Sequence, residues 1–337
     1  MTPRSKAELW LGAFTGFYRP RAEEVRGLDS VSKFLYSARS VILVISAQAA
    51  IVAGLLAATA GEFHTVEFVL VLAGFVVAHM ISNLSNDYFG FKRGHDTPDS
   101  PRMRYTVHPM AGALEPRAFA AGLAILAAIG IAIMAYFVAE RGAPALVFAA
   151  AGIALLLLYD AAPVPLKSIG LGEIAVFLVW GPLMVGGAYA MIAGRVSADA
   201  FYVSVPYGLG VMAILVGKHI DQIDFDSGKG IRTLPVLLGE RAARALNIGI
   251  VVLMYVVAAG LIAIGRLTPF AALIAFALPR AVRAVSVMKR SRPAAPPEGY
   301  VGWPLWYHRV CLEHNRLFGW MYILGLAAGA VWPGVRI

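Results

Sequence analysis

Long apolar runs separated by short polar breaks dominate this chain of 337 residues. A helical run of roughly 20 apolar residues spans about 30 Å of hydrocarbon. The pattern predicts nine such helices, at residues 39–60, 66–89, 118–139, 143–161, 171–193, 199–220, 243–264, 267–286 and 310–332. We therefore expect an all-α membrane bundle formed by residues 39–337, preceded by a cytoplasmic segment 1–38 that carries an interfacial helix.

Composition strengthens the prediction of a membrane protein. Apolar residues make up 59% of the chain and charged residues only 15%, whereas about a quarter of the residues in soluble domains are charged. A single cysteine, Cys311, excludes an intrachain disulfide. No glycine-rich loop joins a strand to a helix, which argues against a nucleotide-binding fold. The positive charge forms no separate basic domain, which argues against nucleic-acid binding.

The distribution of Lys and Arg predicts how the helices are oriented. Cytoplasmic loops of membrane proteins carry an excess of these residues. If the N-terminus is cytoplasmic, the outer side keeps only Arg141, Arg195, Arg266 and Arg336 of the 29 basic residues. We expect a multi-pass protein of the cytoplasmic membrane, with its C-terminus outside. The net charge of +9 then favours an anionic membrane surface or an anionic substrate as partner.

Two polar segments combine carboxylates, basic residues and glycines. NLSNDYFGFKRGHDTPDS occupies residues 83–100 and KHIDQIDFDSGKGIRTLP occupies residues 218–235, each at the cytoplasmic end of a predicted helix. Carboxylates can hold Mg²⁺, and Lys and Arg bind phosphate oxygens. Glycines let the backbone approach an anion. If the two segments face each other, they could bind a diphosphate and help pyrophosphate to leave; the alternative is a pair of ordinary polar loops.

Several stretches resemble the UbiA superfamily of intramembrane prenyltransferases, most closely its menaquinone-type branch. NDYFGFKRGHD resembles the first aspartate-rich motif of the family, and DFDSGKGIRTLPVLLG resembles the stretch that follows its second motif. PVPLKSIGLGE at 163–173 and WGPLMVGGAY at 180–189 resemble a loop and the fifth helix of the family. The resemblance implies a nine-helix fold with a cytoplasmic active face. It also implies that an isoprenyl diphosphate ionises to an allylic cation, which a lipophilic acceptor, aromatic or a quinone precursor, attacks.

The resemblance and the neighbouring charged residues together suggest the members of the site. We expect catalytic roles for Asn86, Asp87, Tyr159, Asp221, Asp224 and Asp226. We expect Mg²⁺ ligation by Asn86, Asp87, Asp96, Asp224 and Asp226, and diphosphate binding by Lys92, Lys167, Lys218, Lys229 and Arg232. For His95, His108 and His219, which lie near the acidic segments, we expect structural roles.

The two segments also depart from the family pattern. The first motif of the family has Asp at the position of Gly90, and the second has Asn, Arg and Asp at the positions of Lys218, Asp221 and Gln222. We expect fewer Mg²⁺ ions than usual and direct contact between Lys218 and the diphosphate. Three alternatives remain at this point: a terpene cyclase on the same fold, a non-catalytic protein that binds isoprenoid lipid, and a transporter.

Overall fold

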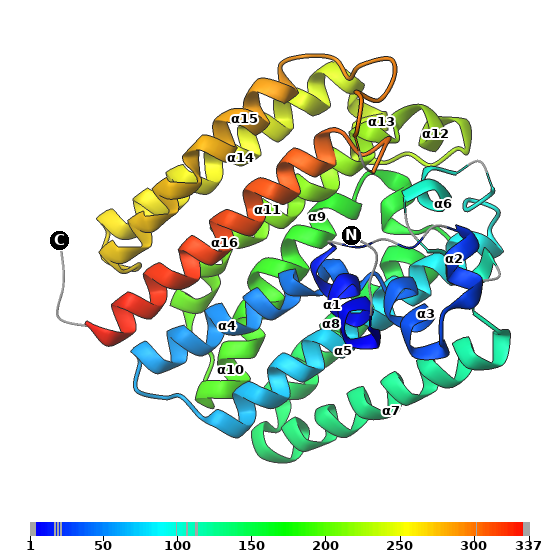
Figure 1. Ribbon diagram of the computed structural model, residues 1–337. Helices are drawn as coiled ribbons and strands as arrows, with labels where there is room; N and C mark the ends of the chain where they lie inside the picture. Colours follow the sequence, from blue (N-terminus) through cyan, green and yellow to red (C-terminus); the bar gives the residue numbers. More distant parts are fainter. Residues whose placement is uncertain are drawn as a thin grey trace. The chain divides into compact units, whose positions relative to one another are not determined.

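The computed structural model describes residues 5–16, 18, 20, 22–98, 100–105, 107–111, 114–300 and 302–332, and these contain helices and no strand (Figure 1). The helices are α1 (Lys6–Thr15), α2 (Ala22–Gly27), α3 (Ser30–Ser37), η1 (Ser40–Ile42), α4 (Leu43–Thr59), α5 (Thr65–Lys92), α6 (Pro101–Tyr105), η2 (Pro109–Ala111), α7 (Pro116–Arg141), α8 (Ala143–Leu156), η3 (Leu157–Ala161), η4 (Leu166–Ile169), α9 (Gly172–Leu178), η5 (Val179–Gly186), α10 (Gly187–Ala193), α11 (Ala198–Asp221), α12 (Ile223–Gly228), α13 (Leu234–Leu238), α14 (Glu240–Ala263), η6 (Pro269–Ala277), α15 (Leu278–Met288) and α16 (Tyr307–Val331). The predicted all-α class is confirmed.

Eight helical segments of the described residues are long and apolar enough to cross a membrane. They are Ser40–Thr59, Thr65–Lys92, Pro116–Arg141, Ala143–Ala161, Gly172–Ala193, Ala198–Asp221, Glu240–Ala263 and Pro269–Met288, each within three residues of a predicted span. The ninth predicted span coincides with α16, which has 25 residues and carries Arg309, Glu313 and Arg316 in its first half. The count of nine spans and their orientation stay predictions.

The chain divides into two compact units. Unit 1 consists of Met1–Ala47 and Leu72–Tyr136, and unit 2 consists of Gln48–Val71 and Phe137–Ile337. The divisions fall inside α4, α5 and α7, so each of these helices contributes residues to both units. The predicted single domain over 39–337 stays a prediction.

The core of unit 1 supports the C-terminal half of α5. Leu84 of α5 is fully buried with Phe119 and Leu126 of α7 in one apolar cluster, and the ring of Phe34 packs against Gly122. The Asp29 side chain caps α3 by accepting hydrogen bonds from the next turn. Burial of this apolar surface stabilises the unit and fixes the end of α5, where the first acidic segment begins.

The core of unit 2 is built around α11, which contacts α9, η5, α14 and α16. A Cβ atom on Gly208 of α11 would lie 2.9 Å from the Cα of Gly181 in η5. Small residues at such crossings let two backbones approach closely, as is common in membrane bundles. In Figure 1, α16 lies between α11 and α15, which it also contacts. These contacts fix the end of α11, where the second acidic segment begins.

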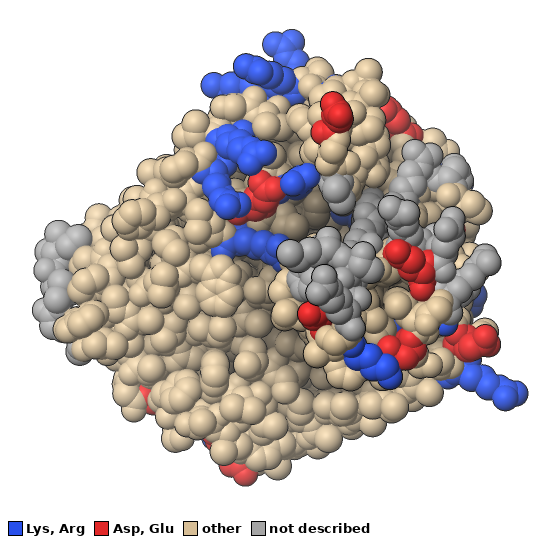
Figure 2. Space-filling model, in the orientation of Figure 1, with Lys and Arg blue, Asp and Glu red and all other residues tan. Residues whose placement is uncertain are grey.

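Charge is unevenly distributed on the surface of unit 2. In Figure 2, Lys and Arg side chains gather at the end where α15 stops and α16 begins, while the surface along α16 is largely uncharged. An apolar flank beside a basic end is typical of helices that cross a bilayer and stop at an anionic interface. The distribution agrees with the membrane location that the sequence predicts.

Candidate active site

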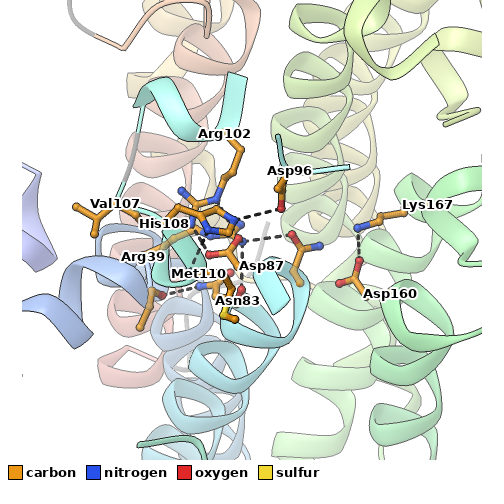
Figure 3. A network of polar contacts seen from close by, with 12 residues as sticks. Arg39, Asn83, Asp87, Asp96, Arg102, Val107, His108, Met110, Asp160 and Lys167 are labelled. Atoms are coloured by element: carbon orange, nitrogen blue, oxygen red, sulfur yellow. Dashed lines mark hydrogen bonds and ion pairs between the residues drawn. The ribbon is translucent and has the colours of Figure 1, made fainter. Parts of the chain in front are cut away.

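The first acidic segment is organised around Asp87, whose side chain is fully buried. Arg39 binds one of its carboxylate oxygens and Arg102 binds both, with Arg102 Nε 2.9 Å from Asp87 Oδ1 (Figure 3). Arg39 Nη2 also donates to the carbonyl oxygen of Asn83 at 3.1 Å and to Asn86 Oδ1 at 3.2 Å. Both oxygens of Asp87 and the amide oxygen of Asn86 are therefore engaged by guanidinium groups.

Arg39 has an unusual backbone conformation. Its φ of 55° makes it the non-glycine residue with positive φ among the described parts of the chain. The left-handed conformation costs an L-residue about 1–2 kcal/mol, and such strain collects at functional sites. Here the conformation starts η1 and lets the side chain reach Asp87.

Asp96 lies in the loop after α5 and is held by His108. The backbone N–H of Met110 donates to His108 Nδ1 at 3.3 Å, so Nε2 carries the ring proton and donates to Asp96 Oδ2 at 3.3 Å. Burial raises the pKa of Asp96, but the hydrogen bond from His108 and the nearby positive charge of Arg102 outweigh this effect, so the pKa of Asp96 lies below its ordinary value. Asp96 is therefore ionised at neutral pH.

The second acidic segment contains a carboxylate in a different situation. Asp226 is 6% exposed, and its buried Oδ2 has no hydrogen-bond partner among the residues that the structure describes. Burial raises the pKa of Asp226 above its ordinary value, opposed by the nearby charges of His219, Lys218 and Lys167. A buried carboxylate oxygen without a partner is costly, and a bound cation would satisfy it.

His219 of this segment forms a buried pair with Glu173, which the sequence analysis did not predict. His219 Nδ1 is 2.6 Å from Glu173 Oε1. Glu173 is fully buried, and within the described part of the chain its other oxygen has no hydrogen-bond partner. The pair joins the last turn of α11 to the first turn of α9. The sequence signal for this pair was Glu173, a carboxylate in the first turn of the apolar helix α9, because a charge buried there requires a partner.

Asp221 was a candidate catalytic residue, and the structure places its carboxylate at the start of α16. Asp221 Oδ1 accepts from the backbone N–H of Tyr307 at 3.0 Å, and Oδ2 accepts from that of His308 at 2.9 Å. These are N–H groups that a helix leaves unpaired at its beginning. Both oxygens thus act as a helix cap, and a catalytic role for Asp221 stays a prediction that this geometry does not favour.

The predicted diphosphate-binding residues have different surroundings. Lys167 forms an ion pair with Asp160, and both side chains are largely buried. Lys218 is half-buried near Asp226. The remaining predicted residues of this kind are more open: Lys92 and Arg232 are exposed, and half-buried Lys229 lies over the ring of Phe225 at 5.6 Å.

Tyr159 and Asp224 complete the predicted set. The half-buried Tyr159 packs against Gly172, at which an added Cβ would lie 3.3 Å from the Tyr159 ring. Asp224 is exposed on α12. Their predicted catalytic and metal-binding roles are not decided by these positions.

The donor atoms allow a test of whether Mg²⁺ fits this chain. Ligand atoms of Asp87, Asp96 and His108 lie within 4.8 Å of one another. However, both oxygens of Asp87 are bound by arginine, and both nitrogens of His108 are engaged. Within unit 2, Asp226 has a buried oxygen without a hydrogen-bond partner among the described residues, and within unit 1, Asp96 has one side-chain contact there, from His108; each could separately offer a carboxylate oxygen to a cation such as Mg²⁺.

Comparison with known sequences gives a consistent picture. A profile of the UbiA prenyltransferase family matches residues 47–306. The chain is similar to the 1,4-dihydroxy-2-naphthoate octaprenyltransferase of Bacillus subtilis (strain 168), with 26% identity over 220 residues that cover 65% of this chain and 70% of that protein. It is also similar to UbiA prenyltransferase domain-containing protein 1 of Dictyostelium discoideum, with 27% identity over 203 residues that cover 58% and 60% of the two chains.

Solved structures share the fold. The UbiA homologue of Aeropyrum pernix K1 gives a TM-score of 0.60 at 19% identity, covering 86% of this chain and 98% of that one. The UbiA homologue of Archaeoglobus fulgidus bound to DMAPP and Mg²⁺ gives a TM-score of 0.56 at 16% identity, covering 88% and 99%. The profile match over most of the chain, together with this fold, leads to one conclusion: the chain belongs to the UbiA prenyltransferase family and is a prenyltransferase.

Proposed function

We propose that the protein transfers an isoprenyl group from an isoprenyl diphosphate to an aromatic quinone precursor, at the cytoplasmic face of the cell membrane. The observation that carries this proposal is Asp226, a buried carboxylate with an unpartnered oxygen close to the cations Lys218 and Lys167. A diphosphate site requires carboxylates that bind a cation and, beside them, ammonium groups that bind phosphate oxygens. The name of the relative from Bacillus subtilis supports a naphthoate-type acceptor.

Each acidic segment contributes its own residues to binding. Asp226 is the residue of the second segment that would hold Mg²⁺, and Asp96 is the residue of the first segment that would do so, each argued from its own unit; the solved homologue with DMAPP and Mg²⁺ is a precedent for the ion. When bound, Mg²⁺ would neutralise charge on the diphosphate and make pyrophosphate a better leaving group. Lys218, Lys229 and Arg232 would bind the remaining phosphate oxygens.

The proposed reaction needs little covalent participation by the protein. The C–O bond of the allylic diphosphate breaks, and its electron pair leaves with pyrophosphate. A ring carbon of the acceptor supplies two electrons for the new C–C bond and then loses its proton. The apolar helices would exclude water, which protects the allylic cation from hydrolysis.

The transfer can be tested with purified protein in lipid nanodiscs. Labelled geranyl diphosphate and Mg²⁺ should release pyrophosphate only when 1,4-dihydroxy-2-naphthoate is added, with formation of a prenylated product. Pyrophosphate release and a cyclised hydrocarbon without acceptor would instead identify a cyclase. Binding without any pyrophosphate release would identify a non-catalytic protein, and either result would overturn the proposal.

A direct role for Lys218 in holding the diphosphate makes a separate prediction. We expect Lys218→Ala to raise the KM for the donor diphosphate and to increase the Mg²⁺ concentration needed for half-maximal turnover. Lys289→Ala is a matched control for loss of one positive charge, because Lys289 is exposed and lies outside the predicted site. The proposed direct contact between Lys218 and the diphosphate is wrong if Lys218→Ala changes neither the KM for the donor nor the Mg²⁺ concentration for half-maximal turnover, and if turnover depends steeply on Mg²⁺ in the wild type and the variant.

A further inference from the structure

The helices α15 and α16 of unit 2 carry a group of arginines on their outer side. Arg280 and Arg283 lie on α15, and Arg309 and Arg316 lie on α16, which packs against α15. Glu313 lies on α16 between the last two, and residues three or four positions apart share one side of a helix. Arg280, Arg283 and Arg309 are exposed, whereas Glu313 and Arg316 are half-buried. We call these five residues the arginine face.

Three of these arginines converge on Glu313. Arg309 Nε is 2.9 Å from Glu313 Oε1, and Arg283 Nη1 is 3.3 Å from Glu313 Oε2. Arg280 Nη1 donates to the backbone carbonyl oxygen of Glu313 at 3.4 Å. One carboxylate thus meets two guanidinium groups directly and a third through its backbone. With four arginines and one glutamate, the arginine face keeps a formal charge of +3.

These charges lie in the bodies of the helices, away from the loop that joins them. Arg280 is eight residues before Met288, where α15 ends, and Arg316 is nine residues after Tyr307, where α16 begins. At about 1.5 Å per residue, each lies about 12–14 Å from its helix end, whereas the polar region of one leaflet is about 5–8 Å deep. A charge below that region is costly unless it is paired. A partner with negative charge at this depth would offset that cost.

Apolar side chains continue this surface beyond the arginines. On α16, Trp320 follows Arg316 by one turn, Leu324 follows Trp320 by another, and both are exposed. Phe276 is exposed about one turn before Arg280. In Figure 2 the basic side chains gather where α15 stops and α16 begins, and the surface along α16 is largely uncharged. The surface is therefore cationic near the connection and apolar farther along, which is the order of the headgroup and acyl chains of a phospholipid.

We propose that the arginine face binds an anionic phospholipid of the surrounding bilayer, with the headgroup phosphate among the arginines and the acyl chains along Trp320 and Leu324. Guanidinium groups form bidentate hydrogen bonds with phosphate, and basic pockets between membrane helices bind anionic headgroups. The phosphate would supply the negative charge that Glu313 alone does not. The five residues lie outside both acidic segments, so this assignment does not rest on the proposed function.

Lipid binding can be measured through the fluorescence of Trp320. The full-length protein would be placed in nanodiscs of phosphatidylcholine with increasing fractions of phosphatidylglycerol, with bromine on the acyl chains of one lipid at a time. Bromine quenches a tryptophan that it contacts. Because the chain has six tryptophans, the Trp320 signal is the difference between wild type and Trp320→Phe. We expect phosphatidylglycerol to bind about tenfold more tightly than phosphatidylcholine; equal affinities would overturn the proposal.

Removing two arginines should weaken this preference. We expect Arg280→Gln combined with Arg283→Gln to lower the affinity for phosphatidylglycerol, relative to phosphatidylcholine, about fivefold for each arginine. The matched control is Arg195→Gln combined with Arg266→Gln, which removes two arginines from exposed ion pairs outside the arginine face. An unchanged preference in the first double variant, or an equal loss in both, would overturn the proposal.

Glu313→Gln acts in the opposite direction, so its effect differs from a loss of folding. This variant removes the carboxylate that competes with a phosphate for Arg283 and Arg309. We expect the relative affinity for phosphatidylglycerol to rise about fivefold, and no change or a fall would overturn the proposal. Absence of Trp320 quenching by either lipid would mean that a protein surface, such as a second copy of this chain, covers the face, and would also overturn it.

Discussion

The two acidic segments read alike as sequence, yet their buried carboxylates are in opposite states. Asp87 in the first is bound by Arg39 and Arg102, whereas none of the described residues forms a hydrogen bond with Oδ2 of Asp226 in the second. A paired buried carboxylate maintains a structure, while an unpaired one is costly until a ligand arrives. The comparison shows that aspartates in similar motifs can have different roles: Asp87 supports the local fold, whereas Asp226 is available to bind a cation.

The most direct test of this difference between the two carboxylates is to neutralise Asp226 by substitution. We expect Asp226→Asn to lower prenyl-transfer turnover about 10²–10³-fold, the range seen when an electrostatic contact to the reacting charge is lost. Its thermal stability should be equal to or above wild type, because a buried charge without a hydrogen-bonding partner is removed. Glu298→Gln, which neutralises an exposed carboxylate outside the predicted site, is the control. Unchanged turnover in Asp226→Asn would remove Asp226 from the site.

For Asp87, the carboxylate that is paired with arginines, we expect that removing a partner lowers the stability of the protein. Arg102→Met leaves the buried Asp87 with a single guanidinium, and breaking such a pair costs about 3–5 kcal/mol. The loss should appear as a lower unfolding temperature in detergent. Arg283→Met is the control, because its ion pair with Glu313 is exposed and worth about 0–1 kcal/mol. Equal losses in both variants would contradict a structural role specific to Asp87.

Stability as a function of pH sharpens the contrast for Asp96 and Asp226. The pKa of Asp226 is raised in the folded protein, so its negative charge lowers the free energy of unfolding at neutral pH. This destabilisation disappears as the pH falls through the raised pKa towards 3.8, the ordinary pKa of an aspartate. The pKa of Asp96 is lowered, so its charge adds stability above pH 3.8 that is lost only as pH falls below that value. Unfolding temperatures between pH 4 and 7, without Mg²⁺, should therefore differ in sign between Asp226→Asn and Asp96→Asn when each is compared with wild type. The same sign for both would contradict the assignment.

The smallest effect concerns the backbone of Arg39. Arg39→Ala and Arg39→Gly both remove the guanidinium, but only glycine adopts a positive φ without strain. We expect the Gly variant to be more stable than the Ala variant by about 1 kcal/mol. Chemical unfolding of the two proteins measures this difference. Equal stabilities would mean that Arg39 relaxes its backbone once its side-chain contacts are lost.

Most of the fold follows from local sequence pattern. The predicted span 143–161 and the helical segment Ala143–Ala161 coincide, because Gly142 and Pro144 mark the start of the helix and the apolar run sets its length. The last predicted span also coincides with a helix, α16, although charged residues in its first half weaken its signal as a membrane span. Helices are governed by contacts between near neighbours in sequence, which a single sequence displays.

The candidate site was less predictable, because its partners are distant in sequence. Asp87 was singled out, but Arg39 lies 48 residues away and Arg102 lies 15 residues away. Glu173 and His219 are 46 residues apart, and neither was expected to contact the other. His108, for which we expected a structural role, holds Asp96. The glycine at position 90 reads as a missing carboxylate, and only the three-dimensional return of the loop reveals Asp96 in its space.

The capping of α16 by Asp221 has a consequence for the order of biosynthesis. The cap joins a residue of the second acidic segment to N–H groups of residues 307 and 308, which the ribosome adds 86 and 87 residues later. In a nascent chain that has inserted α11 but not α16, the carboxylate of Asp221 therefore lacks these two N–H partners. The capped arrangement of Asp221 can therefore form only after translation has reached the first turn of α16.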